Sequence, residues 1–144
     1  MSPVRFHFNV PDVPAYVCRL LRKASATGAK VVVCGPEGIL HKIDTLLWTF
    51  SPLDFVAHCR NTASPALREA SPVVLQTSLD TCTHHDVLLN LHEQVPSGHE
   101  PFARIVEVVG LDELARQHAR TRWKHYAGAG YAIERHDVAQ QDNA

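Results

Sequence analysis

Three segments of this chain contain short, uninterrupted runs of apolar residues. They are Lys30–Cys34 (KVVVC), Pro72–Thr77 (PVVLQT) and Asp86–Glu93 (DVLLNLHE). Because the apolar residues are continuous rather than alternating, these runs predict strands buried on both faces, as in a parallel sheet. The 144 residues are enough for one domain with a core of this kind.

Helical patterns separate the first strands. Val4–Val10 alternates as a strand, and a helix follows to Thr27, with Asp12 as its possible cap and Gly28 ending it. A second helix follows GPEG, with Pro36 in its first turn. Its apolar face comprises Ile39, Leu40, Ile43, Leu46 and Leu47. Two successive strand–helix units predict an α/β sheet with right-handed crossovers.

The rest of the chain continues the α/β pattern. We expect strands at Asp54–Cys59 and Phe102–Val109, an exposed loop at Arg60–Ser71 and a last helix from Leu111 to about Ala129. The sequence predicts one domain over residues 1–131, followed by a polar C-terminal tail, residues 132–144. We expect Glu134–Ala144 of this tail to fray.

Several functional classes lack their usual signatures. There is no P-loop, GxGxxG, GxSxG or HExxH motif, so we expect no cofactor and no catalytic residue. The net charge of -1 gives no general attraction to nucleic acid. No apolar run reaches membrane-spanning length and the start of the chain has no leader pattern, so we expect a cytoplasmic protein without membrane contact.

The cysteines and the cluster TCTHHD raise the question of a metal site. No two of the four cysteines have CxxC spacing, and buried reduced thiols are the expectation. A zinc site would require Cys82, His84 and His85 to meet a distant ligand. Their spacing matches no zinc pattern, so we predict no metal.

The last predicted helix carries a cluster of positive charge although the chain as a whole is nearly neutral. Helical spacing places one stripe on its surface: Arg116, Arg120, Trp123 and Lys124. The face expected to pack inward comprises Leu111, Leu114, Ala115, Ala119 and Tyr126. Arg122 projects toward that inward side.

This cationic stripe suits a ligand that has carboxylates and an apolar or aromatic end. Arginine binds carboxylates through two hydrogen bonds, lysine adds a mobile charge, and tryptophan supplies flat apolar surface. Two alternatives remain open. The stripe can be a solvated helix face with Trp123 half-packed at its edge, or a platform for single-stranded nucleic acid.

The segment ELARQHARTRWKHYAGAGY resembles the C-terminal helix of the chi subunit family of bacterial DNA polymerase III. A second block, from GAKVVVC to FVAHC, resembles the same family. Its marks are Lys30, Asp44, Leu47, Trp48, Phe55 and His58. The strand LLNLHEQVP is the third block, and the resemblance runs from about Val4 to Tyr131.

The resemblance implies a three-layer, Rossmann-like α/β fold with a mostly parallel sheet, helices on both faces and no nucleotide site. It implies an accessory subunit of the clamp-loader assembly that is not itself an enzyme. Such a subunit binds the C-terminal tail of single-stranded DNA-binding protein, which is acidic and ends in an aromatic residue with a free carboxylate. Its association with single-stranded DNA is then indirect.

The resemblance also implies which residues make these contacts. Arg116, Arg120 and Lys124 would neutralise both the acids of the tail and its terminal carboxylate, and Trp123 with Val109 would help line a pocket for its terminal ring. The family commonly has tyrosine where Trp123 stands. Ala127–Gly128 replace a basic position that the family has just after the stripe, and we expect the loss of that charge to weaken tail binding slightly.

A second implied partner is the psi subunit of the clamp loader, where psi is present. The resemblance places it on Trp48 and Phe55, with packing of Trp48 in the core as the alternative.

A different class of function is also left open. A small nucleotide-binding protein or enzyme on the same fold would hold its ligand near Gly35–Gly38, at the C-terminal edge of the strands.

Overall fold

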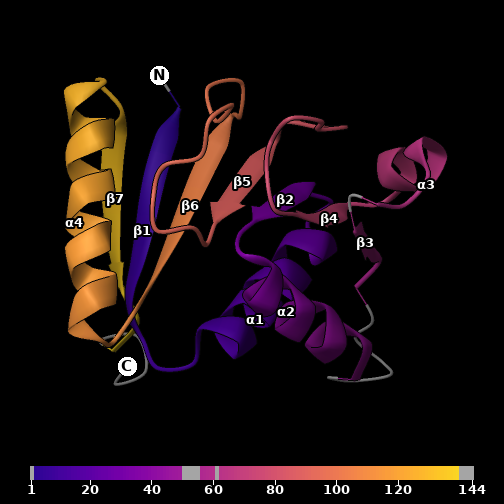
Figure 1. The fold of residues 1–144 in the computed structure, drawn as a ribbon, viewed down its shortest axis with the longest axis horizontal. Helices are drawn as coiled ribbons and strands as arrows, with labels where there is room; N and C mark the ends of the chain where they lie inside the picture. Colours follow the sequence, from indigo (N-terminus) through magenta and orange to yellow (C-terminus); the bar gives the residue numbers. More distant parts are fainter. Residues whose placement is uncertain (1, 50–55, 61, 140–144) are drawn as a thin grey trace.

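The computed structural model of the chain describes residues 2–49, 56–60 and 62–139 (Figure 1). In these residues all seven strands form one parallel sheet in the order β3-β4-β2-β5-β6-β1-β7. The strands are β1 (Pro3–Val10), β2 (Val31–Cys34), β3 (His58–Arg60), β4 (Val73–Gln76), β5 (Val87–Asn90), β6 (Arg104–Gly110) and β7 (Ala132–Asp137). The predicted α/β class and parallel sheet are confirmed.

Helices cover the sheet on both faces and give three layers. The helices α1 (Val13–Ala26) and α2 (Glu37–Thr49) pack on one face, and α4 (Glu113–Gly128) packs on the other, beside β1 and β7 (Figure 1). In β2, Val31 and Val33 belong to the first core and Val32 to the second. The apolar run of β2 is therefore continuous because both faces of this strand are buried, as predicted.

The helix boundaries follow the capping residues. The Asp12 carboxylate accepts a hydrogen bond from the Ala15 amide at 3.2 Å, and Asp112 accepts one from Ala115 at 3.1 Å. Gly28, which follows α1, has a φ of 80°, a conformation that glycine adopts without steric cost. Local side-chain chemistry thus fixes where α1 and α4 begin, and hence where their faces point.

Two segments differ from the sequence-based expectations. Residues 65–70, expected to lie in an exposed loop, form the short helix α3 (Pro65–Ala70), with Ser64 as its cap. Residues 132–137 were assigned to the polar tail, which was expected to fray from Glu134 onward, but they form β7, which pairs in parallel with β1. The expectation was wrong because it took polar composition as a sign of a tail, whereas charged side chains are tolerated on a strand at the edge of a sheet.

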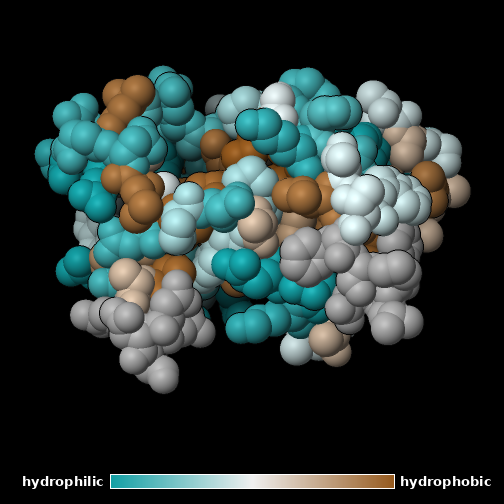
Figure 2. Space-filling model, turned by 90° about the horizontal axis from the view of Figure 1, so that it is seen from below, coloured by the Kyte–Doolittle hydropathy of each residue, from teal (hydrophilic) through white to brown (hydrophobic). Residues whose placement is uncertain are grey.

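The strand predicted at Asp54–Cys59 lies partly outside the described residues, and the structure gives β3 at His58–Arg60. Among the described helices, none combines the length and apolar composition needed to cross a membrane. Figure 2 views the molecule from the side on which the strands end, and hydrophobic side chains appear there as separate patches among hydrophilic ones.

Candidate functional site

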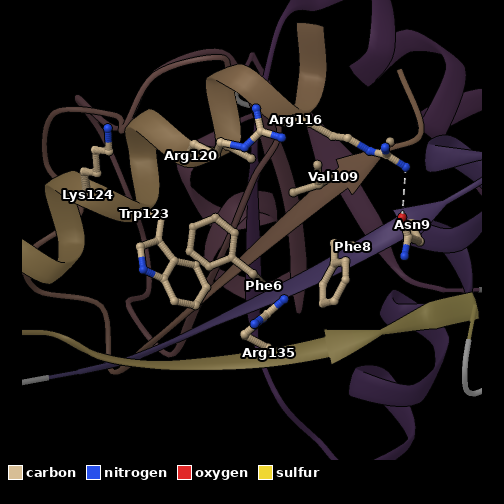
Figure 3. Close-up of a pocket in the computed structure, with 11 residues that line it drawn as sticks. Phe6, Phe8, Asn9, Val109, Arg116, Arg120, Trp123, Lys124 and Arg135 are labelled. Carbon is tan, nitrogen blue, oxygen red and sulfur yellow. Dashed lines mark hydrogen bonds between the residues drawn. The ribbon is translucent and has the colours of Figure 1, made fainter. Parts of the chain in front are cut away.

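A groove with a cavity of about 680 Å³ lies between α4 and the neighbouring strands β1, β6 and β7 (Figure 3). Residues from four elements line it: β1 near the start of the chain, and β6, α4 and β7, which follow one another more than 90 residues later. They are Phe6, Phe8, Asn9, Val109, Gly110, Arg116, Ala119, Arg120, Trp123, Lys124 and Arg135. The structure therefore brings all four stripe residues of α4, together with Val109, to a single cavity.

The wall on the α4 side is cationic. Arg116, Arg120 and Lys124 are exposed, and Trp123 is half-buried between them and the sheet. The indole of Trp123 lies against the ring of Phe6, with ring centroids 5.1 Å apart (Figure 3). Trp123 is thus packed at the base of the stripe while part of its surface faces the groove.

The floor of the groove is apolar. Phe6 and Val109 are buried, and Phe8 is half-buried further along β1. Phe6 and Phe8 are two residues apart in one strand, so their side chains point to the same face of the sheet. Neither residue was predicted from the sequence to line a site, although the alternation of Val4–Val10 contains the signal for this shared face.

Asn9 connects the two walls of the groove at the end of β1. Its side-chain oxygen accepts a hydrogen bond from Arg116 Nη2 at 3.2 Å, and its side-chain nitrogen donates to Asp137 Oδ1 at 3.0 Å. Its φ of 61° is a left-handed conformation, which asparagine tolerates better than most residues. Asn9 was not predicted from the sequence, because its partners lie more than 100 residues away.

The charges around the groove are poorly compensated. Four cationic side chains line it, and none of the lining residues is acidic. Arg120 pairs with the exposed Glu113 at 3.3 Å, a contact of small value in water. Within the described residues, no acid lies within ion-pair distance of Arg116, Lys124 or Arg135. The groove therefore suits an anionic ligand that has an apolar or aromatic part.

A buried polar network fixes the opposite face of α4. Glu107 on β6 is fully buried, and it accepts hydrogen bonds from Arg122 Nε at 2.9 Å, Tyr126 Oη at 2.8 Å and Asn90 Nδ2 at 3.0 Å. Burial raises the pKa of Glu107, and Arg122 with the other donors opposes that rise. Because Arg122 points inward, as predicted, the network sets the rotation of α4 and turns the stripe toward the groove.

The inward face of α4 was predicted only in part. Tyr126 and Ala119 are buried and Ala115 is partly buried, but Leu111 and Leu114 are 50% and 58% exposed. Leu111 precedes α4, and Leu114 lies in its first turn.

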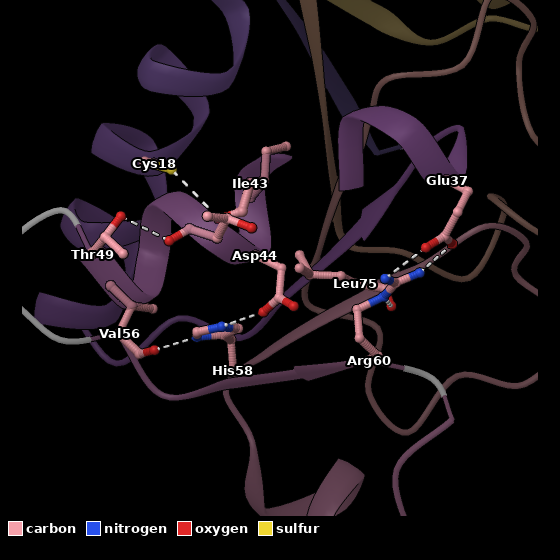
Figure 4. Close-up of polar contacts among 10 residues, drawn as sticks. Cys18, Glu37, Ile43, Asp44, Thr49, Val56, His58, Arg60 and Leu75 are labelled. Atoms are coloured by element: carbon pink, nitrogen blue, oxygen red, sulfur yellow. Dashed lines mark hydrogen bonds and ion pairs between the residues drawn. The ribbon is translucent and has the colours of Figure 1, made fainter. Parts of the chain in front are cut away.

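A second surface surrounds Trp48, near the end of α2. Trp48 is 61% exposed, and its ring lies 5.2 Å from that of His58, so it is not the core residue that the alternative interpretation required. The imidazole of His58 lies between Asp44 Oδ1 at 2.8 Å and the carbonyl oxygen of Val56 at 2.6 Å (Figure 4). These contacts attach β3 to α2. Phe55, the other predicted contact, lies outside the described residues.

Beside this surface, Arg60 of β3 donates to Glu37 at the start of α2, with Nη1 and Oε1 2.9 Å apart (Figure 4). This paired contact lowers the pKa of Glu37. It links the same two elements at the other end of β3.

The zinc hypothesis gains no support from the geometry. In the part of the chain that the structure describes, no three His, Cys, Asp or Glu side chains are placed to hold a metal ion. All four cysteines are free, and only Cys82 is partly exposed. Its thiol accepts a hydrogen bond from Gln76.

The crevice expected for a nucleotide has the wrong chemistry. A second cavity of about 470 Å³ at the ends of β4 and β5 is lined by Asp80 and Glu93 but by no lysine or arginine. A Cβ on Gly35 would lie 2.9 Å from the Cβ of Leu91, so this glycine allows close packing between the ends of β2 and β5. We find no support for phosphate binding at Gly35–Gly38.

Comparisons with known proteins show the family of the chain. A family model described as DNA polymerase III chi subunit, HolC, matches residues 1–134. A Pseudomonas aeruginosa protein named DNA polymerase III subunit chi is 32% identical over 121 residues, covering 83% of this chain and 82% of the relative. Proteins of the same name from Haemophilus influenzae and Escherichia coli are 27% and 26% identical, over 88% and 84% of this chain and 88% and 82% of their own lengths. The chain therefore belongs to the family of the DNA polymerase III chi subunit.

Proposed function

We propose that this chain acts in DNA replication as a non-catalytic accessory subunit of DNA polymerase III, and that its groove captures the C-terminal tail of single-stranded DNA-binding protein. Membership of the chi family supports the accessory role. The observation that carries the tail-binding role is the gathering of four cations without a lining acid around an aromatic floor. Association with single-stranded DNA is then indirect, through the captured tail.

The chemistry of the groove matches that of the tail. Exposed guanidinium and ammonium groups attract an acidic segment and can bind carboxylates directly. The part of Trp123 that faces the groove, supported from below by the buried Phe6, presents apolar surface against which a terminal aromatic ring can pack. A cavity of about 680 Å³ is within the range that holds a small ligand, so it accommodates the last residues of a peptide.

Calorimetry with a synthetic acidic peptide that ends in phenylalanine tests this proposal. Arg120→Ala and Lys124→Ala should each weaken binding by up to about fivefold, since an exposed charge pair contributes roughly 0.2–1 kcal/mol. Affinity should also fall as salt is added. Arg104→Ala is the matched control, because Arg104 is exposed at the other end of β6 from Val109. Wild-type affinity in both groove variants, with the fold intact, would contradict tail binding.

We also propose that the surface around Trp48 binds the psi subunit, where psi is present. Trp48 lies on the last turn of α2 and is 61% exposed, and tryptophan is enriched among the residues that dominate binding at protein interfaces. Trp48→Ala should abolish co-purification with psi while leaving affinity for the tail peptide unchanged. Retention of psi by this variant would exclude Trp48 from the interface.

A further inference from the structure

One cation of the groove lies on the wall opposite α4. Arg135 belongs to β7, and in the pairing of β7 with β1 its direct partner is Phe6. Directly paired residues of neighbouring strands point to the same face of a sheet. Because Phe6 packs against Trp123 of α4, Arg135 also points into the groove, as Figure 3 shows.

The guanidinium of Arg135 is held over an aromatic ring. Its Cζ lies 5.2 Å from the centroid of the Phe8 ring, a cation–π arrangement. Stacking of this kind leaves the N–H donors at the edge of the guanidinium available to a ligand, and it limits the positions that the side chain adopts. No acid of the described residues lies within ion-pair distance of Arg135, so its charge is uncompensated within the groove.

The two walls differ in what they can contact on a peptide. The three cations of α4 extend along the helix from Arg116 to Lys124, which suits the acids spaced along an extended segment. Arg135 instead lies beside the aromatic floor formed by Phe6 and Phe8. In a C-terminal aromatic residue the ring and the free carboxylate belong to the same residue. A cation beside the ring pocket is therefore close to the terminal carboxylate.

We infer that Arg135 recognises the free terminal carboxylate of the bound peptide, whereas the cations of α4 bind the acids that precede it. This inference depends on the proposed tail-binding function. It assigns to β7 the selection of a chain end over an internal acidic segment. Arginine suits this role because its planar fork binds a carboxylate through two parallel hydrogen bonds.

The test compares two forms of one acidic, phenylalanine-terminated peptide, with a free carboxylate and with a C-terminal amide. The wild-type protein should prefer the free acid by about tenfold, the equivalent of about 1.4 kcal/mol. Arg135→Gln should lose most of that preference, and its affinity for the amide should remain within about twofold of wild type. Arg135→Lys should retain part of the preference, since it keeps the charge but not the fork.

Lys124→Ala is the matched groove variant. It should weaken binding of both peptides and leave their ratio unchanged. If Arg135→Gln also weakens both peptides equally, or changes neither while Lys124→Ala still weakens both, the assignment to Arg135 is wrong and tail binding stands. If no groove variant changes either affinity, tail binding itself fails, and the inference fails with it. Because the ratio is the readout, a small loss of fold affecting both peptides does not imitate the expected result.

Discussion

Removal of Arg122 tests whether the buried network holds α4 in place. In Arg122→Met the apolar stem remains, but the Glu107 carboxylate, which is fully buried, loses the donor at 2.9 Å. The carbonyl oxygen of Glu93 also loses its bond from Arg122 Nη1 at 3.0 Å. A buried charge that loses its partner typically costs about 3–5 kcal/mol, a large part of the roughly 5–15 kcal/mol that stabilises a domain.

Urea unfolding at pH 7 measures this cost. We expect Arg122→Met to lower the free energy of unfolding by about 3 kcal/mol or more. The double variant Arg122→Met with Glu107→Leu should regain part of this loss, because no buried charge remains, although the Tyr126 hydroxyl then lacks its acceptor. A cost below about 1 kcal/mol for Arg122→Met would refute the view that this pair holds the helix.

The stability loss caused by Arg122→Met should also depend on pH, in a direction that can be checked. Burial already raises the pKa of Glu107, and loss of Arg122 should raise it further. A carboxyl group whose pKa is raised in the folded state makes the protein less stable as pH rises. The deficit of Arg122→Met should therefore shrink between pH 7 and pH 5. A deficit that is constant over this range would show that the Glu107 carboxylate does not carry the cost.

Three further predictions concern other parts of the fold. Burial lowers the pKa of His7 from 6.5 to about 4, so on acidification the unfolded chain takes up a proton at this residue before the folded protein does. The free energy of unfolding should therefore fall by up to about 3 kcal/mol from pH 6.5 to pH 4. His7→Gln should flatten this part of the stability curve, and an unchanged slope would exclude His7 as its source. Burial raises the pKa of the Cys34 thiol to about 12. Iodoacetamide at pH 8 should therefore modify the partly exposed Cys82 before Cys34. Earlier labelling of Cys34, detected by mass spectrometry, would contradict the burial of Cys34. Gly35→Ala should lower the free energy of unfolding by about 1–3 kcal/mol because of the clash with Leu91, and a wild-type urea midpoint would rule out the close approach.

Those parts of the fold that depend on local patterns were predictable. The apolar run of β2 indicated burial on both faces, and Asp12 marked the start of α1. Spacing along α4 placed Arg116 and Lys124 on one side of the helix and Arg122 on the other. This was possible because the angle between successive residues of an α-helix is fixed, so their relative directions follow from the sequence alone.

The remaining parts depend on contacts between distant segments. β7 is polar because it lies at a sheet edge, so its sequence carries no strand pattern. Without β7, Arg135 could not be placed in the groove. The apolar floor was missed for a related reason, since Phe6 meets Trp123 only after β1 has paired within the sheet.

The most direct test of the central claim is a nuclear magnetic resonance titration of the labelled protein with the acidic, phenylalanine-terminated peptide. If the groove between α4 and the β1–β7 edge binds the tail, the largest shifts should occur at the Trp123 indole N–H and at the amides of Phe6, Val109 and Gly110. Amides near Trp48 should remain unchanged. Shifts concentrated around Asp80 and Glu93, or at Trp48, with none at the groove would contradict the account.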